Sequence, residues 1–384
     1  MNKFNKIKYQ RCNRCVMDTS DLNIQFNSKG ICNHCIKFSQ YKNKLWFPNE
    51  EGEKRLSKLI EKIKKSNRNK KYDCVLGLSG GLDSSYLALK LFELGLNPLV
   101  IHIDAGWNSE LATSNIESII KYCRYDLQTH VVNWEDMKNL QLAYLKAGVS
   151  NQDVPQDHIF LTYLYKYAKK NGIKYLMSGG NIATEGVFPE SWLWSNIDSI
   201  NIKDIFRKNS SKKLLDYKMT SLFEYYFLYP FIYKIKTIRP LNFMRYNKLE
   251  AYKELNKKVG YKNYQRKHGE SVFTSFYQNY YLPKKFKIDK RLAHLSSLIN
   301  SDQITRKEAL QILKEPLYEK NNLKFDKSYV ARKLEISVSE LEKLISNPSQ
   351  KHTSYKNYSS YYNLLKILQS FLTRKFKARL DKYS

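Results

Sequence analysis

The sequence feature that most constrains this chain is an apolar run that ends in a turn of serines and glycines. The run, residues 74–78, predicts a buried strand of a parallel sheet, and an apolar-periodic helix is predicted from about 83 to 94. A strand, a tight turn and a helix N-terminus present free backbone N–H groups and the positive end of a helix dipole. Gly80 and Gly81 let the backbone take positive φ and approach an anion closely. We therefore expect a phosphate-binding turn, the alternative being a glycine turn without a ligand.

The polar side chains of this turn suit a nucleotide. Serine hydroxyls can donate to phosphate oxygens, and a carboxylate can hold Mg²⁺. The turn contains neither Gly-x-x-x-x-Gly-Lys-Ser/Thr nor Gly-x-Gly-x-x-Gly, so those two nucleotide-binding loops are not expected. The residues predicted to bind the nucleotide are Ser79, Gly80, Gly81, Asp83, Ser84 and Ser85, and the three also predicted to take part in catalysis are Ser79, Asp83 and Ser84.

The order Ser-Gly-Gly-x-Asp-Ser resembles the PP-loop of the ATP pyrophosphatases. This resemblance implies an adenine nucleotide alpha-hydrolase-like fold. It also implies an enzyme that cleaves ATP to AMP and pyrophosphate, adenylating an oxygen atom so that a nucleophile can replace it.

Strands and helices alternate after the turn. Further strands are predicted at 98–103, 127–132, 173–177 and 235–238, with helices at 110–122, from 135 onward and at 156–169. Such alternation predicts an α/β fold with a doubly wound parallel sheet that binds its ligand at the carboxyl ends of the strands. We expect three domains: a cysteine-rich module at 1–48, a PP-loop domain at 49–245 with an aromatic insert near 187–234, and a mostly helical C-terminal domain at 246–384.

The ends of two predicted strands supply further candidates. Asp104 ends the second strand and could bind adenine or ribose, or cap its own loop. Paired glycines and polar residues follow the fourth strand and could approach the nucleotide, the alternative being a turn with a capping threonine. The residues predicted to bind the nucleotide there are Gly179, Gly180, Asn181, Thr184 and Glu185. The aromatic insert beside them could be core, a wall of the substrate site or a subunit interface, including one between copies of the chain.

Four of the six cysteines form two Cys-x-x-Cys pairs separated by sixteen residues. This spacing is typical of a structural zinc site with a closed shell of four thiolates, and His34 inside the second pair is expected to be a bystander. The predicted metal ligands are Cys12, Cys15, Cys32 and Cys35. Cysteines used in this way suit a reducing cytosol, and the sequence shows neither an apolar run of about 18 residues nor a signal peptide. We therefore expect a cytoplasmic protein without a membrane span.

The charge balance of the chain is strongly basic. It has 66 Lys and Arg residues against 36 Asp and Glu residues, a formal net charge of +30. Such an excess could attract a nucleic-acid backbone, or it could reflect a proteome rich in Lys, Asn and Tyr, with attraction for ATP and small anionic substrates. Because the positive charge is spread through the chain rather than gathered in one tail, the sequence favours the second interpretation.

Helical patterns dominate after Pro240, and one segment there mixes basic and acidic residues densely. Its cations could neutralise a leaving pyrophosphate, and its histidine or glutamate could move protons. The alternative is a solvated basic face. The residues predicted to be catalytic in this segment are Lys267, His268, Glu270, Lys290 and Arg291. Residues 329–345 have a helix-turn-helix rhythm, from which we infer no DNA-binding function.

Taken together, these motifs resemble the N-acetyl sugar amidotransferases, PP-loop enzymes of bacterial surface-polysaccharide and O-antigen pathways. The resemblance covers nearly the whole chain. It is carried by the two cysteine pairs with Met17-Asp18-Thr19, the serine–glycine turn, 104–108, 180–185, 267–271 and 289–296. Two departures are Gly269, where a bulkier polar residue is expected, and the tyrosine- and lysine-rich insert near 210–235.

The family implies a reaction that converts the acetamido group of a sugar, often nucleotide-linked, into an acetamidino group. ATP, Mg²⁺ and Zn²⁺ are the implied cofactors. Nothing in the chain resembles a glutaminase, so ammonia must come from solution or from a partner. The family implies a glutaminase subunit and a cyclase-like barrel subunit that channels the ammonia.

A tRNA-modifying PP-loop enzyme of the thiolation or lysidine type is the alternative. It would use the basic charge and the zinc module to hold RNA. Thiolation normally requires a catalytic cysteine pair, and the two remaining cysteines, Cys74 and Cys123, are expected to lie in a strand and on a helix. Nucleic acid is therefore not the expected partner.

Overall fold

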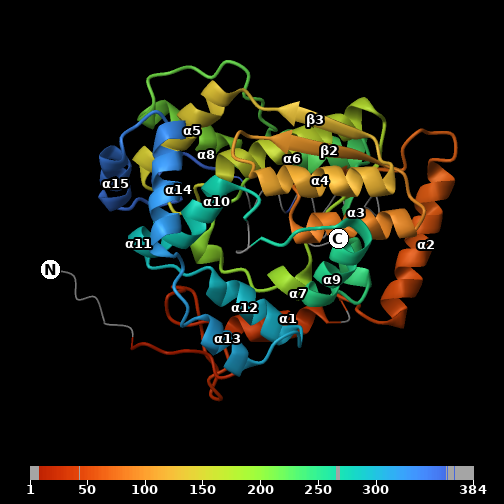
Figure 1. Cartoon of the computed structure of the whole chain (residues 1–384), viewed down its shortest axis with the longest axis horizontal. Coiled ribbons are helices and arrows are strands. Elements are labelled where there is room, and N and C mark those ends of the chain that lie inside the picture. The colour runs from red at the N-terminus through yellow and green to blue at the C-terminus, as the bar shows by residue number, and fades with distance from the viewer. Residues whose placement is uncertain (1–7, 43, 265–268, 360, 362–366, 368–384) are drawn as a thin grey trace.

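A sheet of five parallel strands runs through the molecule, with helices packed around it (Figure 1). The computed structural model describes residues 8–42, 44–264, 269–359, 361 and 367. The strand order is β3-β2-β1-β4-β5. The strands are β1 (Cys74–Gly77), β2 (Pro98–Asp104), β3 (Leu127–Val131), β4 (Tyr175–Met177) and β5 (Lys236–Ile238). Each predicted strand is confirmed, and so is the parallel α/β fold.

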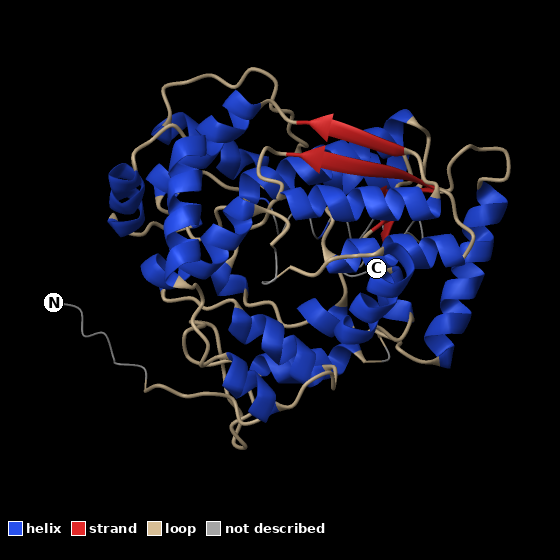
Figure 2. Cartoon of the chain, viewed as in Figure 1, coloured by secondary structure: helices blue, strands red, loops and turns tan. Residues whose placement is uncertain are grey.

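Alternate residues of the central strand β1 enter two different cores. Leu76 lies in the core that includes α3 and α4, whereas Val75 lies in the core that includes α5, α6 and α8. Successive side chains of a strand point to opposite faces, so the sheet is covered on both sides, as predicted for a doubly wound fold. Figure 2 shows helices packed next to the strands, and the edge strand β3 is largely exposed. The helices of this part are α3 (Leu82–Glu93), α4 (Glu110–Cys123), α5 (Trp134–Ala147), α6 (Val154–Lys170), α7 (Ile182–Glu185) and α8 (Ser199–Asn209).

The chain reverses its direction of travel across the sheet at β1. It moves from β1 outward to β2 and β3, and then returns to add β4 on the other side of β1. A crevice forms at the carboxyl ends of the strands where such a reversal occurs. The fold therefore places a ligand site between the turns that follow β1 and β4.

The N-terminal module and its connector pack on the rest of the chain. Helix α1 (Asn33–Tyr41) contacts α12 of the C-terminal region. Helix α2 (Glu50–Ser66) is capped by Asn49, whose side chain accepts from Gly52 N, and it buries Leu56, Ile60 and Ile63 on one face.

The predicted aromatic insert is partly core and partly surface. It contains α8, the 3₁₀-helix η1 (Glu190–Trp192) and the π-helix η2 (Glu224–Ile232). Tyr217 and Tyr229 are buried in the core against α5 and α6, whereas Phe223 and Ile232 are exposed.

The C-terminal region is mostly helical, as predicted. Figure 1 shows α12 and α13 beside α1, and α14 and α15 beside α5. The elements after β5 are η3 (Pro240–Phe243), α9 (Lys248–Val259), α10 (Val272–Phe276), η4 (Tyr277–Tyr281), α11 (Leu282–Phe286), α12 (Arg291–Asn300), α13 (Arg306–Ile312), α14 (Lys320–Lys333), α15 (Val338–Ser346) and η5 (His352–Ser354). Among the described residues, every helix is too short or too polar to cross a membrane. The division of the chain at 48 and 245 stays a prediction.

Candidate active site

The turn that follows β1, residues 79–85, is called the phosphate turn below. Gly80 has a φ of +82°, and a Cβ atom there would lie 2.6 Å from Ala112 O, so no other residue fits without moving the backbone. Gly81 caps α3 without a side-chain hydrogen bond, which leaves the first-turn amides of α3 for a ligand. Ser79 and Ser84 lie side by side, with their hydroxyl oxygens 3.2 Å apart. The turn thus has the form of an anion cradle.

The turn that follows β4 forms the opposite wall. A Cβ atom on Gly179 would lie 2.9 Å from Asp83 C and from Ser84 N, so the two turns approach each other backbone to backbone. Thr184 and Glu185 of α7 line the cavity between the turns.

The C-terminal region covers this cradle. Tyr261 and Tyr264 both donate their hydroxyls to Gly80 O, at 3.2 and 3.0 Å, and so orient the peptide group of the phosphate turn. The segment around Glu270 pairs with the loop after β2, because Ser109 N donates to Glu270 O at 2.9 Å. A Cβ atom on Gly81 would lie 3.1 Å from Glu270 Oε1, so this carboxylate lies against the phosphate turn.

These three walls enclose a cavity of about 400 Å³. Its lining combines hydroxyls, glycine backbone, three carboxylates, a lysine and a histidine, a set that can bind a phosphate chain together with a divalent cation. The lining residues are Ser79, Gly81, Leu82, Asp83, Ser84, Gly179, Gly180, Thr184, Glu185, Lys248, Asn263, Tyr264, Glu270, His294 and Leu298.

Asp83, Glu185 and Glu270 contribute three carboxylates to the lining, and Asp83 is the predicted Mg²⁺ ligand, since Mg²⁺ prefers oxygen ligands shared with phosphates. Tyr246 donates its hydroxyl to Asp83 Oδ1 and packs on Tyr86. Burial, followed by the negative charge of Asp83, holds the pKa of Tyr246 well above its usual range. The Tyr246 hydroxyl therefore stays protonated, and its hydrogen bond orients the Asp83 carboxylate.

Two residues predicted to bind the nucleotide form capping hydrogen bonds in this structure, and their contact with a nucleotide stays a prediction. Asn181 is buried, and its Oδ1 accepts from Thr184 N at 2.9 Å, so it caps α7. Asp104 Oδ1 accepts from Gly106 N at 2.7 Å and caps its own loop. Neither lines the cavity. The loop-capping alternative for Asp104 matches the geometry, whereas the cap of the second turn is Asn181 and not a threonine.

The structure separates the predicted C-terminal catalytic residues. Glu270 reaches the cavity, but Arg291 does not, because its Nη2 lies 2.8 Å from Asp289 Oδ2 and its Nη1 donates to the carbonyl oxygens of Ile312 and Glu315. Lys290 lies near Asp157, where its charge acts against the burial that raises the pKa of that carboxyl to about 7. Lys267 and His268 lie outside the described residues.

Sequence reasoning missed several members of the site. Lys248, at the start of α9, and His294 and Leu298, on α12, line the cavity, and Tyr246 orients Asp83. Only His294 stood in a segment that the sequence singled out. The others come from elements whose packing no local pattern reveals.

Gly269, which departs from the expected pattern, has a steric explanation. A Cβ atom at this position would lie 2.8 Å from Tyr264 Cβ. The tyrosine that holds the phosphate turn therefore occupies the space that a side chain at position 269 would need.

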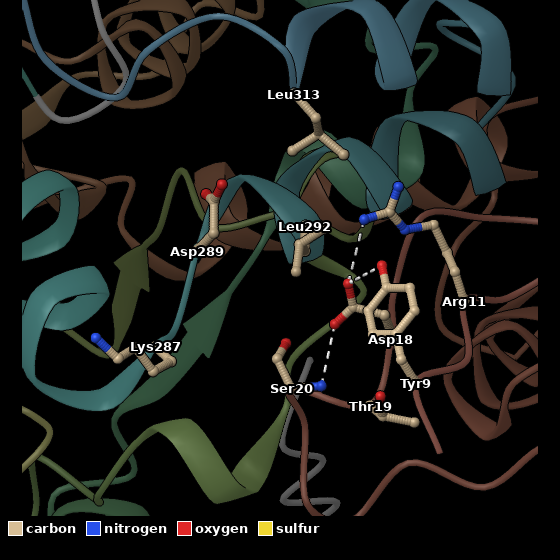
Figure 3. A pocket seen from close by; sticks show the side chains of 9 residues that line it. All are labelled: Tyr9, Arg11, Asp18, Thr19, Ser20, Lys287, Asp289, Leu292 and Leu313. Carbon is tan, nitrogen blue, oxygen red and sulfur yellow. Dashed lines mark hydrogen bonds and ion pairs between the residues drawn. The ribbon is translucent and has the colours of Figure 1, made fainter. Parts of the chain in front are cut away.

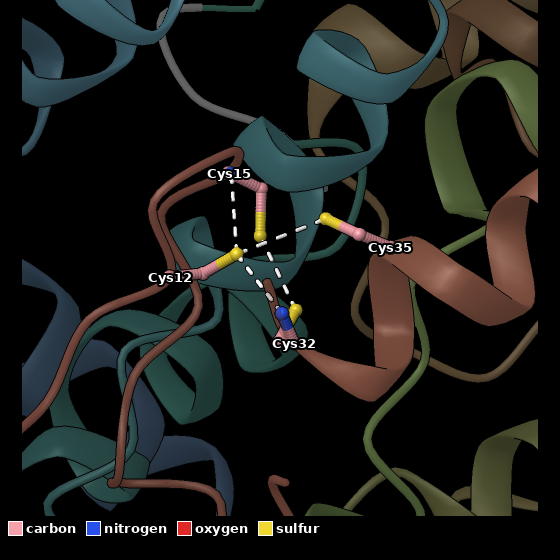
Figure 4. Close-up of side chains that lie close together, drawn as sticks. All are labelled: Cys12, Cys15, Cys32 and Cys35. Atoms are coloured by element: carbon pink, nitrogen blue, oxygen red, sulfur yellow. Dashed lines mark hydrogen bonds between the residues drawn. The ribbon is translucent and has the colours of Figure 1, made fainter. Parts of the chain in front are cut away.

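The four predicted ligand cysteines converge (Figure 4). All are fully buried, their sulfurs lie within 4.8 Å of one another, and the Cys15–Cys32 Sγ–Sγ distance is 3.6 Å. Tetrahedral zinc with bonds of about 2.3 Å separates its sulfurs by about 3.8 Å, so the cluster fits a closed Zn²⁺ site. Its backbone supports thiolates, for example through Cys32 N, which donates to Cys12 Sγ at 3.2 Å. His34 instead pairs with Asp21 at 2.6 Å and is not part of the cluster.

A second cavity, of about 460 Å³, lies between the N-terminal module and the segment before α12 (Figure 3). Both carboxylates in its wall are paired: Asp18 accepts from the lining residues Tyr9, at 3.0 Å, and Arg11, at 3.3 Å, and Asp289 accepts from Arg291, which is not a lining residue. We assign it no ligand. Its lining residues are Tyr9, Arg11, Asp18, Thr19, Ser20, Lys287, Asp289, Leu292 and Leu313.

One region of the chain matches the model of a known protein family. Residues 270–369 match the family model of the C-terminal domain of LPS biosynthesis proteins of the WbpG-like type. This region is therefore similar to WbpG-like proteins. Over these residues the match agrees with the predicted resemblance to proteins of bacterial surface-sugar biosynthesis. A search of curated proteins found no match.

Solved structures align with the chain at low similarity. NMN synthetase from Francisella tularensis is 13% identical at a TM-score of 0.30, covering 75% of this chain and 96% of that chain. The NH3-dependent NAD synthetase from Campylobacter jejuni is 13% identical at 0.32, covering 69% and 97%. The U34-tRNA thiolase NcsA from Methanococcus maripaludis is 13% identical at 0.32, covering 80% and 89%. At these TM-scores the alignments carry no argument about function.

Proposed function

We propose that the chain is an ATP-dependent amidotransferase that converts the acetamido group of a nucleotide-linked sugar into an acetamidino group. One observation carries this proposal. The cavity takes Ser79 and Asp83 from the phosphate turn, and Glu270 and His294 from the region similar to WbpG-like proteins of LPS biosynthesis. A nucleotide site built partly from that region supports an ATP-using step in surface-sugar biosynthesis.

The proposed reaction replaces a poor leaving group with a good one. The amide oxygen attacks the α-phosphorus of ATP, pyrophosphate leaves, and ammonia then adds to the activated carbon and displaces AMP. The amide oxygen ends on AMP, and the sugar gains a C=NH group. Ser79, Ser84 and the first-turn amides of α3 would hold the pyrophosphate oxygens. Asp83 would hold Mg²⁺, which supplies charge neutralisation on the phosphates when bound.

The proposal also includes a source of ammonia and a metal for the four-cysteine cluster. We propose that a glutaminase and a cyclase-like barrel subunit supply ammonia, since no part of the sequence resembles a glutaminase. Zn²⁺ is the proposed metal of the four-cysteine cluster, where a closed thiolate shell leaves no position for catalysis.

The tRNA-modifying alternative would use the net charge of +30 and the four-cysteine module to hold RNA. Thiolation needs an accessible, low-pKa thiol. The two cysteines outside the cluster, Cys74 and Cys123, are both buried, and burial raises the pKa of Cys123 to about 12.

Pyrophosphate release tests the proposal. The protein is supplied with ATP, Mg²⁺ and ammonium, together with either UDP- or CMP-linked diacetamido sugars or bulk tRNA. We expect release that depends on a sugar, and a product lighter by about one mass unit because NH has replaced O. Ser84→Ala, which removes a hydroxyl of the phosphate turn, should slow release. Release with tRNA alone would contradict the proposal and favour the RNA alternative.

A further inference from the structure

Helix α12 stands between the cysteine cluster and the nucleotide cavity. Residues four apart share one side of a helix, so Ser296 and Asn300 form one side and His294 and Leu298 form another, nearly opposite. The first pair meets the cluster and the second pair lines the cavity. One helix thus contacts both sites.

The contacts on the cluster side are polar and buried. Ser296 Oγ accepts from Val16 N at 3.2 Å, next to the first cysteine pair. Asn300 is fully buried, and its Nδ2 donates to Cys35 Sγ at 3.5 Å and to Ser296 O at 2.8 Å. Four thiolates around a divalent metal carry about two negative charges, so a buried N–H···S bond stabilises the loaded cluster.

A cation from the C-terminal region adds to this support. Arg306, at the start of α13, donates from Nε to Cys15 O and from Nη2 to Cys12 O, both at 3.0 Å. The cluster is therefore held by α13 as well as by α12, the helix that lines the nucleotide cavity.

The opposite side of α12 and the C-terminal end of this helix form part of the cavity wall and hold its neighbour α7. His294 and Leu298 line it directly. Ser297 Oγ accepts from Val187 N at 3.0 Å, and Ser301 Oγ donates to Ala183 O at 2.8 Å, so α12 also holds α7, which carries Glu185.

The N-terminal module contacts the end of α7 as well. A Cβ atom on Gly186 would lie 2.5 Å from the ring of Phe38, which belongs to α1 of the module. The module therefore touches both of the elements, α7 and α12, that form this wall of the cavity.

We propose that the loaded cysteine cluster positions the nucleotide cavity, with Asn300 as the positioning residue that sets α12 and thereby His294. This inference rests on the proposed ATP-cleaving function, because it assigns pyrophosphate as the group that His294 meets. The cluster then does more than hold the N-terminal module together. When loaded with metal, it also supports the geometry in which the cavity binds pyrophosphate.

Binding of Mg²⁺ and inorganic pyrophosphate to the full chain tests this, measured by calorimetry together with the rate of metal loss to a chelator. Asn300→Leu keeps the branched arrangement of side-chain heavy atoms and removes the N–H···S bond. We expect about tenfold faster metal loss and about tenfold weaker pyrophosphate binding. Asn67→Leu is the matched control, because Asn67 is also buried and donates to Ile63 O and Asp73 O, remote from both sites. It should change neither readout.

A double-mutant cycle separates positioning from general damage. If Asn300 acts through His294, the losses of binding in Asn300→Leu and His294→Gln should not add in the double variant. Additive losses, or faster metal loss with unchanged pyrophosphate binding, would overturn the inference. If Asn300→Leu does not fold, two substitutes replace it: the variant Asn300→Ser, and the wild-type chain after a chelator has removed its metal. Circular dichroism checks that each is folded before pyrophosphate binding is measured. A wild-type chain that does not bind pyrophosphate would instead contradict the proposed function itself.

Discussion

At the scale of residues, the site depends on groups that orient a carboxylate as much as on the carboxylate. Asp83 is a sequence-evident candidate for Mg²⁺, but its direction is set by the Tyr246 hydroxyl, which is held protonated by burial. A hydrogen bond to a charged group contributes about 1.5–3 kcal/mol, or roughly a tenfold or larger effect on an equilibrium.

Tyr246→Phe should therefore raise the Mg²⁺ concentration needed for half-maximal pyrophosphate release by about tenfold. The matched control is Tyr86→Phe, because Tyr86 packs on Tyr246 but donates its hydroxyl to Glu254 at 3.1 Å. A Mg²⁺ titration of both variants gives the comparison. Equal Mg²⁺ requirements in the two variants would remove Tyr246 from the site.

Substitutions at two glycines with positive φ can separate the cost of a left-handed backbone conformation from the cost of a steric clash. Gly80→Ala places a Cβ atom 2.6 Å from Ala112 O, whereas Gly260→Ala, at a similar φ, meets nothing within 4 Å. Both variants should lose about 1 kcal/mol of stability from the left-handed backbone. Only Gly80→Ala should lose further stability and pyrophosphate binding, as thermal unfolding and calorimetry can measure. Similar losses in both variants would contradict the close approach.

At the scale of elements, the sequence predicted what local patterns encode. The five strands and the cysteine spacing follow from short stretches, since apolar runs and ligand pairs are local signals. The lining of the cavity does not, because Lys248 and His294 arrive there only through the packing of α9 and α12.

Local patterns also could not show where the predicted C-terminal catalytic residues would lie. Arg291 and Lys290 looked like pyrophosphate ligands because basic residues are dense in their segment. The start of α12 instead turns the Arg291 guanidinium onto Asp289 and the end of α13. A sequence pattern does not show which side of a helix faces the cavity.

Arg291 is therefore expected to hold α12 and α13 together rather than to bind substrate. Arg291→Met should lower the melting temperature by several degrees, since it removes a paired, multiply bonded guanidinium. It should leave the affinity for pyrophosphate within about twofold of the wild-type value. Calorimetry on the folded variant measures this, and a tenfold loss of affinity would return Arg291 to the site.

At the scale of the whole molecule, two buried histidines tie distant segments together in their neutral form. His158 binds Asn196 O through Nδ1 at 2.6 Å and accepts from Thr220 N at Nε2. His352 likewise meets Asn201 Oδ1 through Nδ1 at 2.9 Å and accepts from Asn151 N. Burial lowers the pKa of His158 to about 4 and that of His352 to about 3.

Stability should therefore fall with acid from about pH 6.5. Below that pH an unfolded histidine binds a proton that the folded one does not, so each residue removes up to about 1.4 kcal/mol per pH unit until its folded pKa is reached. Denaturant unfolding between pH 8 and 5 measures the slope. His352→Gln should be less stable at pH 8 but show a shallower loss toward pH 5. An unchanged slope would contradict the neutral, buried assignment.

The central claim is that the cavity transfers an amide oxygen to the α-phosphorus of ATP. The most direct measurement is to supply a nucleotide-linked diacetamido sugar labelled with oxygen-18 in its acetamido groups, with ATP, Mg²⁺ and ammonium, and to analyse the AMP by mass spectrometry. We expect one labelled oxygen in AMP for each amidine formed. Label retained in the sugar, or formation of ADP and phosphate in place of AMP and pyrophosphate, would contradict the account.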